Sequence, residues 1–419
     1  MKETSLIPKL FFSLKGYSKE KFKNDVIAGV IVAIIALPLS IALALASGVT
    51  PEQGLYTAII AGFIISFLGG SNVQIAGPTA AFATIVAGIV ATKGLDGLAI
   101  ATIMAGLILI VMGLLRIGNL IKFMPNSITT GFTSGIAVTI VIGQLKDFFG
   151  VTFTHSPVET MEKLTEFAKC FSTVNISALI IGILALIILI VTPKFLKKIP
   201  ASLIAILVCS VIVGVFGVKA NTIGDLYNIS QSLPKFAFPE ITTQKIISLI
   251  PDAFTIAILA AIESLLSCVV ADGMTGTDSK HNSNMELIAQ GAGNIGSALF
   301  GGIPATGAIA RTAANIKNGG TTPVAGMIHA IILLFVLVVF MPYASLIPMP
   351  VIAAILFMVA YNMSEWRYFV HVCKKAPKLE VIVLLVTFIL TVVFDLIVAI
   401  AVGLSLHIIF LLISKVLKK

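Results

Sequence analysis

Residues 75–91 read IAGPTAAFATIVAGIVA, and this stretch decides the fold that we predict. Its Gly77-Pro78 break precedes a run of small and apolar residues that is too short to cross a bilayer, which takes about 20 residues. A second such stretch, residues 301–316, reads GGIPATGAIARTAANI and contains the one arginine inside an apolar region, Arg311. Two half-length segments interrupted by Pro and Gly, in corresponding positions of two halves, are typical of the binding site of a secondary transporter. Because each half-helix directs the positive end of its dipole at the shared centre, the pair favours an anion.

The composition indicates a polytopic membrane protein. Of the 419 residues, 58% are hydrophobic and 11% are charged, whereas a soluble domain carries roughly 25% charged residues. The net charge of +9 comes largely from lysines at the ends of apolar runs, so it indicates a positive-inside bias rather than nucleic-acid binding. The four cysteines lack metal-binding spacing and no paired catalytic groups occur in register, so we expect no metal site, no cofactor and no enzyme activity.

Apolar runs and the breaks between them predict an all-α polytopic membrane protein with fourteen transmembrane segments, as seven plus seven. The segments of the first half are residues 26–46, 54–68, the half-helix 79–91, 97–115, 127–145, 176–191 and 201–215. Those of the second half are residues 252–271, 285–300, the half-helix 306–316, 323–340, 350–361, 379–393 and 396–414. Residues 61–70 resemble residues 292–302, which supports an internal repeat. An odd number of segments in each half makes the two repeats inverted.

The loop charges predict the orientation in the membrane. With the N-terminus inside, the lysine-rich residues 1–24 and the basic loops around Lys194 and Arg367 fall on the cytoplasmic side. The longer loops 146–173 and 217–250 fall outside and mix both signs. The positive-inside rule therefore predicts that both termini are cytoplasmic.

Two charged residues inside apolar segments are candidates for the chemistry. Glu263 lies in the middle of residues 252–271, where a carboxylate costs about 2.5–3.5 kcal/mol and usually faces an internal cavity. We interpret Glu263 as a proton or sodium carrier; the alternative is a structural carboxylate. Ser267, one turn later, is a second oxygen for sodium, or else a serine that bonds its own backbone. Arg311 requires an anionic partner, which is either Glu263 or a bound substrate, and a structural ion pair is its alternative.

Other polar residues near these segments carry weaker signals. The hydroxyls of Thr79, Thr306 and Thr312 lie near the half-helix starts, where they either donate to a bound anion or cap the helices. Asp272 follows a segment and is expected to be solvated, and Glu286 is expected to lie at the interface.

The motifs resemble those of a known family. Residues 25–81, 261–276 (AIESLLSCVVADGMTG) and 307–326 (GAIARTAANIKNGGTTPVAG) resemble the sulfate permease (SulP) family of anion transporters. The resemblance implies a core domain of segments 1–4 and 8–11, residues 25–122 and 251–341, which moves against a gate domain of segments 5–7 and 12–14, residues 123–250 and 342–419. Residues 1–24 form a cytoplasmic N-terminal segment. The resemblance also implies a homodimer and a cation-linked acidic position at Glu263. The implied substrate site between the half-helices consists of Thr79, Ala80, Ala81, Thr306, Ala308, Ala310 and Arg311.

Three departures from the family pattern refine this expectation. Pro38 is followed by Leu39, where many sulfate-transporting members have Gln, and this favours the bacterial bicarbonate or dicarboxylate branch and hence a bacterial inner membrane. In the sodium-bicarbonate members of the family the equivalent pair resembles an Asp with a Thr one turn later. Here the pair is Glu263 and Ser267, which favours a proton over sodium as the coupling ion. Most members end in a cytoplasmic STAS domain, whereas residue 419 follows the last predicted segment. We therefore expect the membrane domain without a STAS domain, either as a short member of the family or as a piece of a longer protein.

The sequence therefore predicts a secondary active transporter of a small inorganic or carboxylate anion, such as sulfate, bicarbonate or a C4-dicarboxylate. Coupling to protons or sodium at Glu263 and Ser267, an elevator-type motion and contact with membrane lipids belong to this expectation. A passive anion channel or exchanger of the same fold is one alternative, and a nucleobase permease with the same seven-plus-seven architecture is another.

Overall fold

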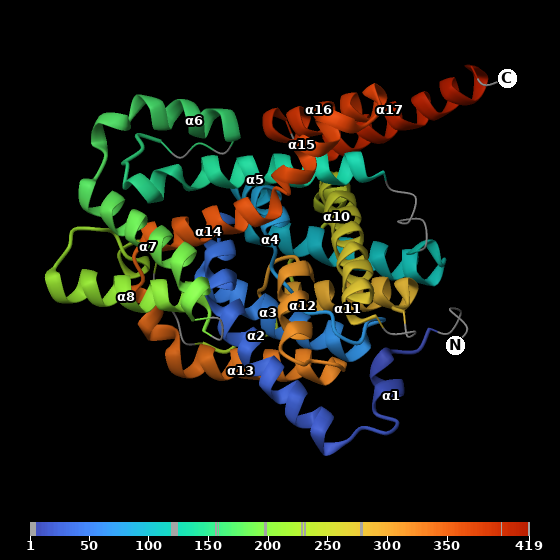
Figure 1. Cartoon of the computed structure of the whole chain (residues 1–419), viewed down its shortest axis with the longest axis horizontal. Helices are drawn as coiled ribbons and strands as arrows, with labels where there is room; N and C mark the ends of the chain where they lie inside the picture. The colour runs from blue at the N-terminus through green and yellow to red at the C-terminus, as the bar shows by residue number, and fades with distance from the viewer. Residues whose placement is uncertain are drawn as a thin grey trace.

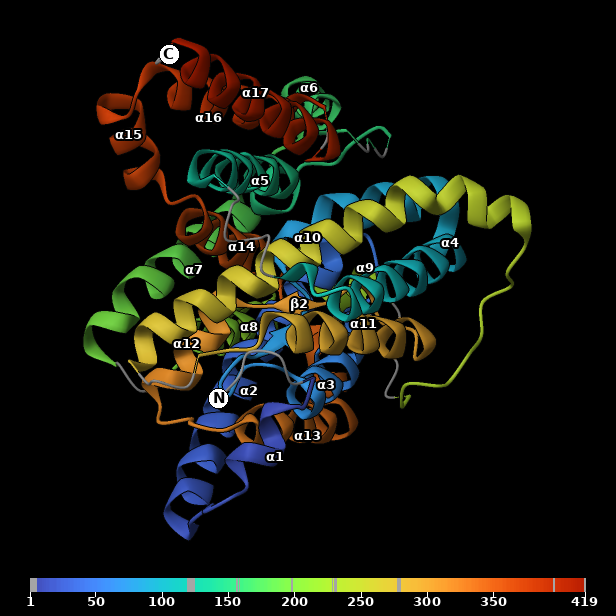
Figure 2. The same cartoon turned by 90° about the vertical axis from the view of Figure 1, so that its right-hand side faces the viewer.

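The structure is a computed structural model that describes residues 6–118, 125–155, 157, 159–196, 199–227, 229, 232–276, 280–394 and 396–417, with side chains in the last helix from 398 to 410. It is helical almost throughout, with one short two-stranded sheet near its centre (Figures 1 and 2). Eight helices among the described residues are long and apolar enough to cross a membrane. Lipid favours such helices because they satisfy every backbone hydrogen bond internally.

The elements follow the predicted order. The first half contains α1 (Lys9–Ser13), α2 (Lys19–Ala46), α3 (Pro51–Leu68), β1 (Ala76–Gly77), α4 (Ala80–Leu114), α5 (Asn126–Phe149), α6 (Thr160–Lys169), the 3₁₀ turn η2 (Phe171–Thr173), α7 (Ile176–Phe195), α8 (Ala201–Phe216) and α9 (Ile223–Leu226). The second half contains α10 (Thr243–Thr275), α11 (Ser283–Leu299), β2 (Thr306–Gly307), α12 (Ile309–Lys317), α13 (Pro323–Phe340), the 3₁₀ turn η3 (Met341–Leu346), α14 (Met349–Met363), α15 (Trp366–Lys375), α16 (Lys378–Val393) and α17 (Leu396–Leu417).

Local signals explain where several helices begin. Thr50 and Gln53 form a capping box before α3, whose first residue is Pro51, and the side chain of Asn175 accepts from two backbone N–H groups at the start of α7. These side chains satisfy N–H groups that have no acceptor within the helix. A helix start with this chemistry is readable from sequence.

Each of the fourteen predicted segments overlaps a helix, but two details were wrong. The segments 79–91 and 97–115 are parts of one element, α4, in which Gly94 (φ 70°, ψ −177°) interrupts the helical backbone. The second half-helix begins at Ile309 rather than at Thr306, because Thr306 and Gly307 form strand β2. The strand pairing is a long-range interaction, so the local sequence does not predict it.

The two breaks pair with each other at the centre of the molecule. Strands β1 and β2 are antiparallel, with Ala76 opposite Gly307 and Gly77 opposite Thr306. The order of elements around them repeats, as α2-α3-β1-α4 and α10-α11-β2-α12. Antiparallel pairing of equivalent strands is the relation expected between inverted repeats.

The helices pack in two groups. In the lower group, which occupies the middle and lower part of Figure 1, α4 packs against α10 and α11, and α3 packs against α11 and α13. In the upper group α5 packs against α14 and α16. The two groups contain the segments that the family resemblance assigns to core and gate. The division into moving domains stays a prediction, and its boundary between residues 122 and 123 lies outside the described residues.

Small residues allow the helices of the lower group to approach closely. A Cβ added to Gly106 on α4 would lie 2.6 Å from the carbonyl oxygen of Gly291 on α11, and one added to Gly291 would lie 2.7 Å from Ile110. Such contacts are the usual basis of helix association in membranes.

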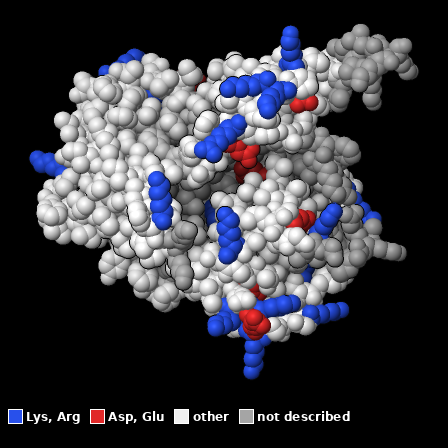
Figure 3. Space-filling view, in the orientation of Figure 1, with Lys and Arg blue, Asp and Glu red and all other residues white. Residues whose placement is uncertain are grey.

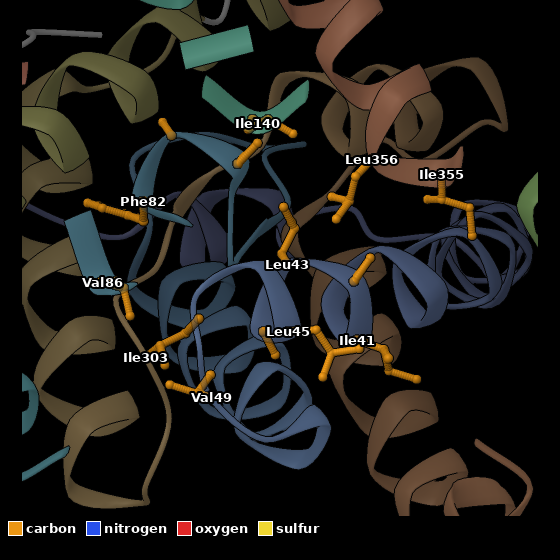
Figure 4. Packing of buried hydrophobic residues seen from close by; sticks show 14 of the residues in the cluster. Ile41, Leu43, Leu45, Val49, Phe82, Val86, Ile140, Ile303, Ile355 and Leu356 are labelled. Carbon is orange, nitrogen blue, oxygen red and sulfur yellow. The ribbon is translucent and has the colours of Figure 1, made fainter. Parts of the chain in front are cut away.

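A continuous apolar cluster extends from α2 and α4 to α5 and α14 (Figure 4).

The connection between α5 and α7, which includes α6 and lies outside the membrane-spanning helices, contains a buried carboxylate. Glu166 on α6 is 2% exposed and accepts hydrogen bonds from the hydroxyl (2.5 Å) and the backbone N–H (3.0 Å) of Thr154. The hydroxyl bond, above all, lowers the pKa of Glu166 from 4.5 to about 2, although burial of the carboxyl acts in the opposite direction. The two hydrogen bonds from Thr154 therefore favour the charged form of Glu166.

Candidate functional site

The starts of α4 and α12 meet next to the paired strands. Thr79 and Ala308 are the residues before the two helices, and both have extended backbone. The first N–H groups of a helix have no acceptor within it, so those of Ala80 and Ala81 and those of Ile309 and Ala310 are available to a ligand. Both helix dipoles direct partial positive charge at this point.

The site is more open on the side of α12 than on the side of α4. Ile309 is 44% exposed and Ala310 is exposed, whereas Ala80 is 6% and Ala81 is 1% exposed. Thr79 and Ala308 are half-buried.

The structure places Glu263 beside Thr79. Glu263 is half-buried on α10, and the hydroxyl of Thr79 donates to its Oε2 over 2.9 Å, across 184 residues of sequence. A predicted coupling residue and a predicted substrate residue therefore share one hydrogen bond.

Arg311 lies behind the breaks rather than in the open part of the site. It is 2% exposed, and its Nη2 donates to the carbonyl oxygen of Pro78. Its Nη1 has no hydrogen-bond partner among the described residues, and no ion pair within this part of the chain joins Arg311 to Glu263. The guanidinium thus links the second half-helix to the first break and keeps an uncompensated positive charge behind the site.

Hydroxyl groups on α10 hold both breaks in place. The hydroxyls of Ser264 and Thr306 are 2.6 Å apart, and the Ser264 oxygen also accepts from the N–H of Gly307 over 3.0 Å. One turn later the hydroxyl of Ser267 donates to Thr312 over 3.3 Å, and Thr312 accepts from a backbone N–H of the first break over 3.0 Å. These threonines fix the breaks and do not cap α12, which was one of the two interpretations of their role.

Ser267 lies one turn from Glu263, as predicted, but it is fully buried and its hydroxyl donates to Thr312. Among the described residues no group of three or more His, Cys, Asp or Glu side chains has the arrangement of a metal site.

A buried polar row on α11 supports the loops before the strands, and sequence reasoning missed it. Glu286 accepts from the N–H of Gly70 and from the side chain of Gln290, each over 2.9 Å. Asn294 exchanges two hydrogen bonds with the backbone of Ala305, over 2.8 and 2.9 Å. The spacing of four residues between these polar side chains was the signal that could have identified the row.

Two minor predictions were wrong. Glu286 is 1% exposed rather than interfacial, because its carboxylate accepts from the loop that precedes β1. Asp272 is not free in solvent, since it accepts from the ring of His281 over 2.7 Å.

Comparison with known proteins assigns the family. The family model described as "Sulfate permease family" matches residues 22–387. The chain belongs to the sulfate permease family. It is 46% identical to "Putative sulfate transporter YvdB" of Bacillus subtilis, over 94% of this chain and 74% of that protein. It is 35% identical to "Bicarbonate transporter BicA" of Picosynechococcus, over 92% of this chain and 70% of that protein.

Solved structures have the same fold. The transmembrane domain of a cyanobacterial bicarbonate transporter BicA superposes with a TM-score of 0.82 at 32% identity, over 91% of this chain and 98% of that one. The structure of SLC26A9 superposes with a TM-score of 0.87 at 21% identity, over 98% of this chain and 68% of that one, and this likeness concerns the fold alone. The predictions of an all-α polytopic membrane fold and of a non-enzymatic anion transporter are therefore confirmed.

Proposed function

We propose that the protein is a secondary active transporter that binds a small oxyanion between the N-termini of α4 and α12 and couples its movement to a proton at Glu263. The observation that carries this proposal is the 2.9 Å hydrogen bond from Thr79 to Glu263, which connects the anion position to an ionisable group.

Binding rests on backbone groups and on fixed positive charge. The N–H groups at the two helix starts match the oxygens of a tetrahedral or trigonal oxyanion, and each helix end contributes the equivalent of about half a positive charge. Arg311 adds a full charge from behind, at 2% exposure, where solvent screens it little. This arrangement suits sulfate, bicarbonate or the carboxylate of a C4-dicarboxylate; the names of YvdB and BicA favour the first two.

Coupling follows from the single proton of the Thr79 hydroxyl. A hydroxyl donates one hydrogen bond, so while Thr79 donates to a charged Glu263 it does not donate to an anion. A proton on Glu263 removes the like charge beside the anion and releases the Thr79 hydroxyl to donate to it. Two unit charges about 4 Å apart at an effective dielectric constant of ~20 repel by roughly 4 kcal/mol, which is enough to make anion binding depend on the proton.

A proton fits Glu263 better than sodium does. The predicted second sodium ligand, Ser267, is fully buried and donates its hydroxyl proton to Thr312. A sodium site would require this bond to rearrange, whereas protonation of Glu263 would not.

Elevator motion, a homodimer, a bacterial inner membrane and two cytoplasmic termini complete the proposal. The two packing groups support the motion, because the whole anion site lies on the helices of one group. The positive-inside charge pattern supports the orientation.

A passive anion channel or exchanger of this fold is the second candidate, favoured by the open α12 side of the site. The family match replaces the nucleobase permease alternative with an anion transporter.

The test is uptake of labelled sulfate, bicarbonate or fumarate into proteoliposomes under an inward proton gradient, a sodium gradient or neither. We expect one anion to accumulate only under the proton gradient and to leak out when the gradient is dissipated. Glu263→Gln should abolish accumulation and retain anion exchange. Accumulation driven by sodium alone would overturn the choice of proton, and purely downhill flux of the wild type would make the protein a channel or exchanger.

A further inference from the structure

The short helix α15 lies between two apolar helices at the outer edge of the upper group. The chain turns at Glu365, which has left-handed backbone (φ 44°, ψ 35°), so α15 is not a continuation of α14. The hydroxyl of Ser134 on α5 donates to the carbonyl oxygen of Ser364 over 2.6 Å and fixes this turn. With 10 residues α15 is about 15 Å long, too short to span a bilayer. Figure 2 shows it beside α5 and the start of α16, away from the centre of the molecule.

One face of α15 is packed against the protein. Val372 is 6% exposed, and the ring of Phe369 lies 5.3 Å from the ring of Phe388 on α16. These contacts fix the rotation of the helix about its axis, and so they determine which residues face outward.

The outward face combines apolar and basic residues. Trp366 and Val370, one turn apart, are 47% and 38% exposed. On the helix they are adjacent to the exposed Arg367 and Lys374, and the Arg367 guanidinium lies over the Trp366 ring at 5.5 Å. An apolar edge next to a basic edge is the pattern of a helix that lies in the membrane interface.

The charge around α15 is positive. Residues 365–380 contain four exposed basic residues, Arg367, Lys374, Lys375 and Lys378. The acidic residues of this stretch are Glu365 and Glu380, so its net charge is +2. Figure 3 shows several Lys and Arg side chains on the upper part of the molecule and others at its lower end. This charge is complementary to anionic lipid headgroups, each basic residue near such a surface strengthening binding roughly fivefold.

We propose that α15 lies in the membrane interface and binds anionic phospholipid headgroups through Arg367, Lys374 and Lys375, with the Trp366 ring among the acyl chains. The connection to α14 on one side and α16 on the other holds the helix at the level where headgroups begin. The proposal does not depend on which anion is transported or on how transport is coupled.

Trp366 makes the proposal directly measurable, because it is the single tryptophan of the chain. The full chain is reconstituted into phosphatidylcholine vesicles that contain about 30% of a lipid with brominated acyl chains, either phosphatidylcholine or phosphatidylglycerol. Bromine quenches only a tryptophan in contact with the acyl chains, so the fluorescence reports the lipids next to α15.

We expect the brominated phosphatidylglycerol to quench Trp366 severalfold more strongly than the brominated phosphatidylcholine at the same fraction. The preference should weaken from about 0.05 to 0.5 M salt, because salt screens exposed charges. In R367Q/K374Q/K375Q the two lipids should quench equally. The matched control K19Q/K21Q/K23Q removes the same number of exposed charges at the start of α2 and should keep the preference.

Equal quenching of the wild type by the two lipids would overturn the headgroup site. Absence of quenching by both lipids would place Trp366 in water or against a protein partner and overturn the interfacial position as well. Loss of the preference in the control variant would show that net charge, not α15, attracts the lipid.

Discussion

The hydroxyl of Thr79 is the most informative group to remove. Thr79→Val keeps the shape of the side chain and deletes the donor that bonds Glu263 over 2.9 Å. Because we propose that this donor turns to the anion when Glu263 is protonated, the variant should bind the anion more weakly. A hydrogen bond to a charged acceptor contributes about 1.5–3 kcal/mol, and at ~1.4 kcal/mol per tenfold change this predicts a KM for uptake raised roughly 10- to 150-fold.

The assay is the concentration dependence of anion exchange in proteoliposomes, which does not require a proton gradient. Thr79→Ser keeps the hydroxyl and should restore KM to within a fewfold of the wild type. A Thr79→Val protein that folds normally and has a KM within twofold of the wild type would refute the reasoning. If the Val effect appears only in gradient-driven uptake, Thr79 serves Glu263 alone and does not contact the anion.

Three further predictions concern other side chains. Arg311→Ala should raise the KM for anion exchange more than tenfold through loss of a buried positive charge, whereas Arg311→Lys should retain part of the affinity; an unchanged KM in Arg311→Ala would exclude an electrostatic role. Glu263→Gln should lose proton-driven accumulation in the uptake assay while exchange persists, and normal accumulation would contradict the coupling role. The pKa of Glu166 is about 2, below the ordinary 4.5, so its charged form stabilises the fold above about pH 4.5 and this stabilisation is lost as the pH falls towards 2. The difference in Tm between the wild type and Glu166→Gln in detergent should therefore be constant above pH 5 and shrink below pH 4.5; a difference that persists at pH 2 would contradict this assignment.

Much of the architecture was predictable because its causes are local. In lipid the backbone must satisfy its own hydrogen bonds, so apolar runs of sufficient length become helices, and every predicted segment overlaps one. The Gly77-Pro78 break marked the start of α4 to within one residue, because proline is tolerated at the start of a helix and not in its interior. The error at Thr306 arose because the pairing of this residue with Gly77, 229 positions earlier, determines its conformation.

The sequence by itself determined that the chain is a polytopic membrane protein with two short interrupted segments, an arginine inside an apolar region and a carboxylate, Glu263, in the middle of a predicted segment. Hydropathy, Pro/Gly breaks and charge are properties of neighbouring residues, and the resemblance to the family rests separately on the residues of three stretches, 25–81, 261–276 and 307–326. Only the tertiary structure decided the partners: Thr79 bonds Glu263, Arg311 bonds the carbonyl of Pro78, and Glu286 bonds the loop at Gly70. These contacts join residues more than 180 positions apart, and a buried polar group accepts whichever complementary partner the packing of the helices brings to it.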